Sequence, residues 1–201
     1  MRRQYRKTAP KVKHGKVQRK DRCAPTPTCY NSTFDYPMIE RWRPGCGFRH
    51  LLRREQIERF IGLLPDWPEL SQGLNAIVLA RGEPYCDGWH RPGVVALCAW
   101  DRELAREVDR AWFDEHRVVF DMIGLSWLEI DEGDVLCQWT ESTARAYQLT
   151  HVLLHELGHH HDRMTTRSQR RSCRGETYAE RYALRHASVI WRRYLAAFGN
   201  P

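Results

Sequence analysis

The sequence predicts an α+β fold, on three observations. Apolar residues recur at helical spacing over residues 48–64 and over two C-terminal segments, about 143–161 and 176–198. Two short apolar runs, at 75–80 and 93–99, are partly β-branched and predict strands. The length of 201 residues suits one folded domain and does not favour a second full domain, so we expect one domain in which a small sheet packs against the helices.

Proline and glycine set the boundaries of the first elements. Pro65 ends the helical pattern of 48–64, because proline cannot continue a helix. The segment between the two strand runs, residues 82–92, is rich in glycine and proline and predicts a connecting loop. The two runs are therefore interpreted as two strands of one sheet.

The middle of the chain predicts one more helix and a hairpin. Asp101 can cap a helix that continues to Gly124, a residue suited to end it. The runs 126–130 and 135–139 flank an acidic, glycine-containing spacer, which favours a β-hairpin. We expect this hairpin to lie in the same small sheet as the earlier strands.

Positive charge is concentrated at the amino terminus. The net charge is +7, but residues 1–22 alone hold ten Lys or Arg and one acid, so the remaining residues are slightly acidic. We expect residues 1–46 to be a disordered basic tail or linker that contains proline and cysteine, and residues 47–201 to form the folded domain. Residues 1–22 can make weak nucleic-acid contacts through counterion release. The alternative is a solvated extension with no specific role.

Composition also predicts the compartment. The amino terminus lacks the apolar core of a secretory signal, and no run approaches the roughly 18 apolar residues of a membrane span, so we expect no membrane association. The seven cysteines form an odd set without a CxxC pair, which suits a reducing compartment better than a disulfide framework. These features predict a cytoplasmic protein.

The motif that carries chemistry is His155-Glu156-Leu-Gly-His159. Histidines at i and i+4 lie on one face of a helix, where both imidazoles can reach one cation. Neutral imidazole nitrogens suit Zn²⁺. Glu156 lies about 100 degrees around the helix from His155, so it can act as general base on the water that the metal activates.

The motif lies on a helix that the sequence predicts to be buried. Thr140 or Ser142 can cap this helix, and apolar residues such as Leu153 and Leu157 surround the histidines. Burying two histidines and a glutamate costs several kcal/mol unless a partner offsets it, and a metal is such a partner. The alternative is a buried histidine pair that hydrogen-bonds to its neighbours.

A second helix offers two carboxylates at i and i+4. Glu176 and Glu180 occupy the start of a stripe that otherwise continues with core residues such as Ala187 and Ile190. A catalytic zinc needs three protein ligands, so we expect Glu176 to be the third ligand and Glu180 to orient one of the histidines. The alternative is that both are first-turn carboxylates stabilised by the helix dipole.

The two motifs together resemble the gluzincin branch of the zincin metallopeptidases. His155-Glu156-Leu-Gly-His159 followed by Glu176-x-x-Ala-Glu180 is most similar to ImmA/IrrE-like domains. The resemblance covers about residues 143–184 and implies a zincin-like fold, with a small sheet packed on an active-site helix and a C-terminal ligand-bearing helix. It also implies that Glu176 is a ligand and that Glu180 supports the site. The chain has Glu180 where the family usually has Asn or Asp.

The sequence leaves the residue that stabilises the oxyanion open. A peptide carbonyl that becomes tetrahedral needs a hydrogen-bond donor aimed at its oxygen. Four residues near the motifs could supply one: Tyr178, Tyr182, His90 and His186.

Other polar residues near the motif have simpler interpretations. His160 and His161 point away from the ligand face, and His151 shares that face but is expected to be a core or rim histidine. Five arginines (Arg163, Arg167, Arg170, Arg171, Arg174) occur between the two helices, either as a mobile solvated loop or as a site that recognises acidic groups.

These features predict a zinc-dependent peptidase that hydrolyses peptide bonds of a peptide or protein substrate. In zincins the substrate commonly adds a strand to a sheet edge above the metal, so we expect an exposed edge strand at the cleft. One alternative is a zinc-containing regulatory or sensing domain that acts by binding, with nucleic acid contacted through the tail. Another is a nucleic-acid-binding protein without metal. Substrate and oligomeric state do not follow from the sequence.

Overall fold

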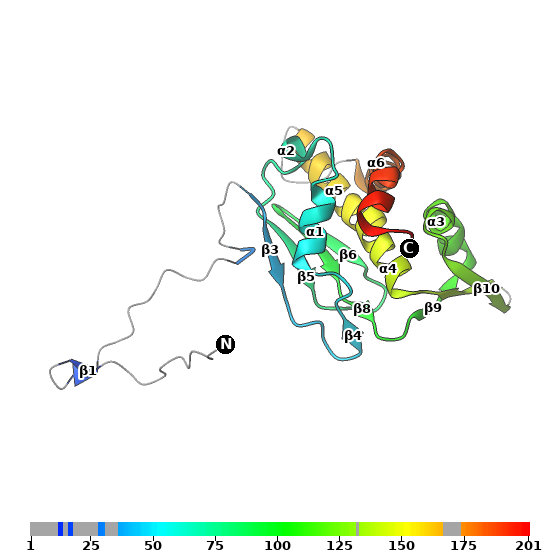
Figure 1. Cartoon of the computed structure of the whole chain (residues 1–201), viewed down its shortest axis with the longest axis horizontal. Coiled ribbons are helices and arrows are strands. Elements are labelled where there is room, and N and C mark those ends of the chain that lie inside the picture. The colour runs from blue at the N-terminus through cyan, green and yellow to red at the C-terminus, as the bar shows by residue number, and fades with distance from the viewer. Residues whose placement is uncertain (1–11, 14–15, 18–27, 31–35, 132, 167–173) are drawn as a thin grey trace.

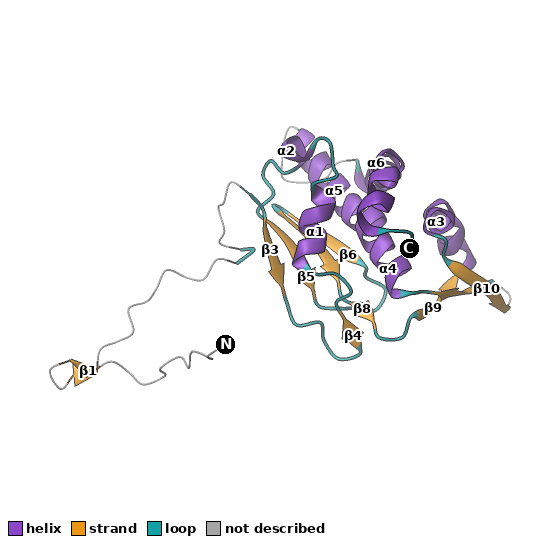
Figure 2. Ribbon diagram, viewed as in Figure 1, coloured by secondary structure: helices purple, strands orange, loops and turns teal. Residues whose placement is uncertain are grey.

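The computed structural model describes residues 12–13, 16–17, 28–30, 36–131, 133–166 and 174–201. Helices and small sheets are mixed along the chain, so the predicted α+β class is confirmed (Figure 2). Most of the basic tail expected over residues 1–22 lies outside the described residues. Within it, β1 (Val12–Lys13) pairs antiparallel with β2 (Lys16–Val17).

The main sheet has four strands in the order β3, β5, β7, β6. These are β3 (Met38–Arg41), β5 (Ala76–Ala80), β7 (Val94–Cys98) and β6 (Gly88–Arg91). The first three run parallel, and β6 returns antiparallel along β7. This order leaves β6 at one edge of the sheet.

Both faces of the two central strands are buried, as the continuous apolar runs indicate. Ile77 and Leu97 face the main core beneath the helices. Val78 and Ala96 face the opposite side, where Cys29 packs against them.

The described part of the chain contains seven helical segments. They are α1 (Arg54–Ile61), α2 (Trp67–Leu70), α3 (Arg110–Ile123), α4 (Glu141–Tyr147), the π-helical η1 (Gln148–Leu153), α5 (Leu154–Thr165) and α6 (Gly175–Phe198). Segments α4, η1 and α5 follow one another without a break and form the central helix of the fold (Figure 1). Thr140 caps it by accepting the Thr143 N–H at 3.0 Å, as one of the two predicted caps.

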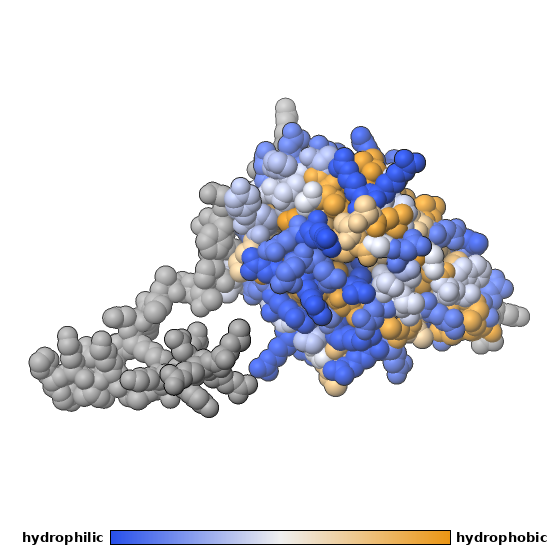
Figure 3. Space-filling model, in the orientation of Figure 1, coloured by the Kyte–Doolittle hydropathy of each residue, from blue (hydrophilic) through white to orange (hydrophobic). Residues whose placement is uncertain are grey.

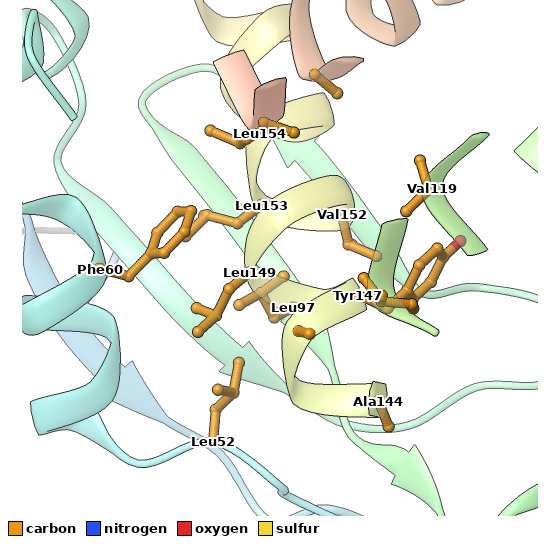
Figure 4. Packing of buried hydrophobic residues seen from close by; sticks show 14 of the residues in the cluster. Leu52, Phe60, Leu97, Val119, Ala144, Tyr147, Leu149, Val152, Leu153 and Leu154 are labelled. Atoms are coloured by element: carbon orange, nitrogen blue, oxygen red, sulfur yellow. The ribbon is translucent and has the colours of Figure 1, made fainter. Parts of the chain in front are cut away.

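The central helix buries side chains on two sides. Figure 4 shows Leu153 pointing toward Phe60 of α1 and Tyr147 pointing toward Val119 of α3. All four side chains belong to one core cluster, which extends to Leu97 on the main sheet. Burial on both sides holds this helix between α1, the sheet and α3.

The predicted hairpin forms but belongs to a different sheet from the one expected. Strands β10 (Ser126–Asp131) and β11 (Asp134–Gln138) pair antiparallel, and β11 also pairs with β9 (Ala105–Asp109). A further pair joins β4 (Phe48–Arg49) to β8 (Trp100–Asp101). The expectation of a single small sheet was therefore wrong.

The helix expected to begin at Asp101 begins later. Residues 105–109 form β9, because they alternate in exposure and pair with β11, and Asp109 caps α3 by accepting the Trp112 N–H at 2.8 Å. Gly124 ends the helix in the left-handed region, at φ 68°, as predicted. The helix expected over 48–64 is shorter as well, since its first residues form β4.

The boundary expected between residues 46 and 47 was wrong. Strand β3 is an integral strand of the main sheet, pairing in parallel with β5. Cys29 is buried, and its N–H donates to Glu40 Oε2 at 2.6 Å. The fold therefore includes residues that the proline-rich composition had assigned to a linker, because the outer face of the sheet needs an apolar cover.

The described cysteines are free thiols, at positions 29, 46, 86, 98 and 137. Cys86 and Cys98 lie nearest each other, with their Sγ atoms 3.8 Å apart. Cys23 and Cys173 lie outside the described residues.

The described helices and surface give no sign of a membrane span. None of these helices combines the length and the apolar character needed to cross a bilayer. In the view of Figure 3, hydrophilic residues cover the outer side of α1, while hydrophobic residues reach the surface near α6 and near β10. Helix α1 has the amphipathic pattern that its position requires, since Ile57 and Phe60 are buried.

Helices α5 and α6 touch at a glycine. A Cβ added to Gly158 would lie 2.9 Å from Ala179 Cα and 3.1 Å from Tyr182 Cβ. Only glycine allows the two backbones to come this close. The contact sets the separation between the two helices that bear the sequence motifs.

We therefore predict that Gly158→Ala destabilises the chain by about 1–3 kcal/mol, although alanine ordinarily stabilises a helix relative to glycine. Denaturant unfolding followed by circular dichroism measures the change. Gly62→Ala is the matched control, because its Cβ would lie no closer than 3.4 Å to its neighbours. Equal effects of the two substitutions would contradict the close contact.

Candidate metal centre

The structure brings His155, His159 and Glu176 together. Both histidines lie on α5, and Glu176 lies in the first turn of α6. Glu176 Oε2 is 3.1 Å from His155 Nε2 and 3.3 Å from His159 Nε2. The three side chains form a group that could hold a metal ion.

The geometry of this group fits zinc. Donor atoms bound to one zinc at 2.0–2.1 Å in a tetrahedron lie about 3.4 Å apart. The two contacts of Glu176 are close to that spacing. Two imidazole nitrogens and one carboxylate oxygen are also the donor types of a catalytic zinc site with one open position.

Glu180 contacts the second ring nitrogen of His155. Its Oε2 is 3.3 Å from His155 Nδ1, on the opposite side of the ring from Glu176. A proton on Nδ1 donated to this carboxylate leaves Nε2 as the free donor nitrogen. Burial alone would lower the pKa of His155, but the hydrogen bond that its ring donates to Glu180 and the nearby carboxylates outweigh burial and raise that pKa.

Asp162 positions the start of α6, a role that sequence reasoning missed. Its carboxylate is fully buried and accepts the Arg174 N–H at 2.7 Å, the Arg174 Nε–H at 2.8 Å and the Gly175 N–H at 3.3 Å. Asp162 lies three residues after His159, so the helix with the histidines also ties down the residue before Glu176. The sequence did contain a signal for this role, because Asp162 is an acidic residue on the buried side of the helix that carries the motif.

Glu156 lies against the main sheet. It is 7% exposed, and its Oε1 would be 2.9 Å from a Cβ at Gly88. Any other residue at position 88 would also meet Val152 Cγ1 at 2.7 Å. Gly88 thus leaves room for the carboxylate beside the backbone of β6.

A cavity of about 560 Å³ borders the candidate metal centre. Its lining includes residues 85–90 together with His155, Glu156, His159 and Glu176. This volume is typical of ligand sites. Strand β6, which had been expected to be a loop, is the edge strand that borders the cavity. The sequence signal for it was weak because the strand starts at Gly88 and is followed directly by Pro92 and Gly93.

Of the four residues considered for the oxyanion, only His90 lines the cavity. Its ring stacks on that of His159, and burial lowers its pKa to about 4, so it is neutral at physiological pH. Its buried Nε2 has no hydrogen-bond partner among the described residues. Tyr178 OH bonds to His161 Nδ1 at 2.7 Å, and Tyr182 is buried between the helices.

Two of the extra histidines have structural partners. His160 Nε2 lies 2.9 Å from the Gln72 carbonyl, and His161 Nδ1 contacts Tyr178. Neither joins the group around Glu176. In the arginine-rich segment, Arg163 and Arg174 are described, whereas Arg167, Arg170 and Arg171 lie outside the described residues.

No protein-family model, curated protein or solved structure matches the chain. Its function is therefore inferred from the residues and geometry of the site.

We predict that Glu156→Gln stabilises the metal-free chain at neutral pH. Burial raises the Glu156 pKa from 4.5 to about 7, so the folded state binds this proton more tightly than the unfolded state. The contribution of Glu156 to the free energy of unfolding of wild type is fully present below pH 4.5, and it is lost as the pH rises toward 7. The variant should exceed wild type by about 1 kcal/mol at pH 5 and about 3 kcal/mol at pH 8.

Denaturant unfolding in the presence of a chelator measures this difference across pH 5–8. Glu69→Gln, at an exposed position on α2, is the control and should show no such trend. A difference for Glu156→Gln that does not change with pH would contradict a raised pKa.

Proposed function

We propose that the chain is a zinc-dependent peptidase with a zincin-like arrangement. His155, His159 and Glu176 are the proposed zinc ligands, and Glu156 is the proposed general base. The observation that carries the proposal is that all four side chains line one cavity beneath the edge strand β6. A buried carboxylate beside three potential ligands is the arrangement that hydrolysis by activated water requires.

Zinc in this site would act as a Lewis acid and lower the pKa of water toward neutrality. Glu156 takes the proton from the attacking water and delivers it to the leaving amine. Burial raises the Glu156 pKa to about 7 in the metal-free site, and the positive charge of a bound zinc would lower that pKa, so the carboxylate is available to accept the proton. Glu180 holds the His155 ring in the orientation that points Nε2 at Glu176.

The free edge of β6 supports an extended peptide as substrate. An edge strand presents backbone N–H and C=O groups that can pair with a peptide strand. Gly88, Trp89 and His90 on this edge face the cavity. His90, as a neutral imidazole, has one N–H that can donate to the carbonyl oxygen of the bond under attack.

The resemblance to gluzincins agrees with this proposal in the order of the parts. The helix with His155 and His159 precedes the helix with Glu176, and both pack beside a sheet whose edge strand borders the site. Glu180 occupies the position that supports the site in ImmA/IrrE-like domains.

Glu156→Gln should keep its zinc and lose peptidase activity. The substitution removes the proton acceptor but none of the proposed ligands, so we expect kcat to fall by about 100-fold or more. Cleavage of a degenerate library of fluorogenic peptides measures activity, and elemental analysis measures zinc. Glu69→Gln should match wild type in both.

An active Glu156→Gln variant would show that this residue is not the base. A zinc-loaded wild-type chain that cleaves no peptide in the library would favour the regulatory or sensing alternative.

Glu176→Ala should weaken zinc binding by at least about 10-fold, because a catalytic site has only three protein ligands. Competition with a chromophoric chelator measures the affinity. Glu55→Ala is the matched control, since Glu55 is also an exposed first-turn carboxylate, on α1. If Glu176 only interacts with the helix dipole, the two variants will bind zinc equally well.

A further inference from the structure

A second group of potential ligands lies beside the first. His116 on α3, His151 on η1 and Glu180 on α6 each offer one donor atom, and these atoms all lie within 4.8 Å of one another. We propose that the chain binds a second divalent metal ion at His116, His151 and Glu180, and that this ion is zinc. The proposal is independent of peptide hydrolysis, because it concerns binding alone.

The orientation of His116 prepares one nitrogen for a metal. Its Nδ1 lies 2.8 Å from the Trp112 carbonyl, which can only accept a hydrogen bond. Nδ1 therefore carries the proton, and Nε2 keeps its lone pair free. A histidine that donates one N–H to a backbone carbonyl is the usual form of a metal ligand.

The two groups have similar internal geometry. The His116 and His151 rings lie 5.1 Å apart at 77°, and the His155 and His159 rings lie 4.9 Å apart at 76°. His151 Nε2 is 3.6 Å from Glu180 Oε2, close to the spacing of about 3.4 Å between donors on one tetrahedral zinc. The donor atoms of this group lie within 4.8 Å of one another, so they would have to move closer together to reach that spacing.

Buried polar atoms in this group lack partners. His151 is 3% exposed, and its Nδ1 has no hydrogen-bond partner within the described part of the chain, so Nδ1 would carry the proton while Nε2, which faces Glu180, would bind the ion. Glu180 Oε1 also has no hydrogen-bond partner among the described residues, although Glu180 Oε2 contacts His155. A carboxylate can accept the His155 N–H and still bind a cation, because it has about four lone-pair sites. A metal at Glu180 would offset the cost of burying this charge.

The second group opens onto the same cavity as the first. His116 and His151 line it together with His155 and His159, which gives an ion a route to these two histidines, whereas Glu180 lies outside the lining. Two imidazoles and a carboxylate are borderline donors that suit zinc better than calcium or magnesium. The ion would place positive charge at the end of the cavity that Trp112 and Tyr147 line.

Zinc stoichiometry of single variants tests the proposal. The metal-free chain is loaded with Zn²⁺, dialysed and analysed by inductively coupled plasma mass spectrometry. Compared with wild type, His116→Gln and His159→Gln should each lose one zinc per chain, and the double variant should lose two. His186→Gln is the control, because His186 belongs to neither group. Circular dichroism of the metal-free variants checks that each one folds.

A measurement on wild type needs no variant. A crystal of the zinc-loaded chain should give two anomalous peaks at the zinc edge, one at each group. A single peak at His155 and His159, with no zinc lost in His116→Gln, would overturn the second ion and leave the proposed function intact. A single peak at His116 and His151 would instead overturn the metal centre of the proposed function. No peak would overturn both.

Discussion

The candidate metal centre depends on the close contact between helices α5 and α6. Gly158 lets the two backbones approach at Ala179, and this approach brings Glu176 within 3.3 Å of both histidines of the motif. A side chain at position 158 would separate the helices and move the carboxylate out of reach. The same glycine lies between the two histidines in sequence, so packing and chemistry depend on one short segment.

Burial of charge is the second constraint on this region. Asp162 is fully buried and is satisfied by the N–H groups that begin α6, while Glu180 is satisfied in part by His155. Such groups are costly without partners, so each of them restricts how the helices can be arranged. The helix that carries the motif is further held by the core on two sides, through Tyr147 and Leu153.

Strand β6 gives the site its other wall. The carboxylate of Glu156 fits beside the sheet because Gly88 has no side chain, and the resulting burial raises the Glu156 pKa to about 7. The edge of β6 then borders the cavity in which the proposed base and ligands lie. Substrate binding and proton transfer, as proposed, would both depend on this one strand.

Local patterns in the sequence were enough to predict the α+β class, the strands at 75–80 and 93–99, the hairpin and the two long helices, because periodicity and caps are local properties. They also singled out His155, Glu156, His159, Glu176 and Glu180. Only the tertiary structure decided that residues 88–91 form the edge strand, that β3 belongs to the sheet and that the hairpin pairs with β9. Those outcomes depend on which apolar surfaces must be buried and which strands can pair. Both are decided by residues that are far apart in the sequence. The same holds for His116, which approaches His151 and Glu180 only when α3 packs against the central helix.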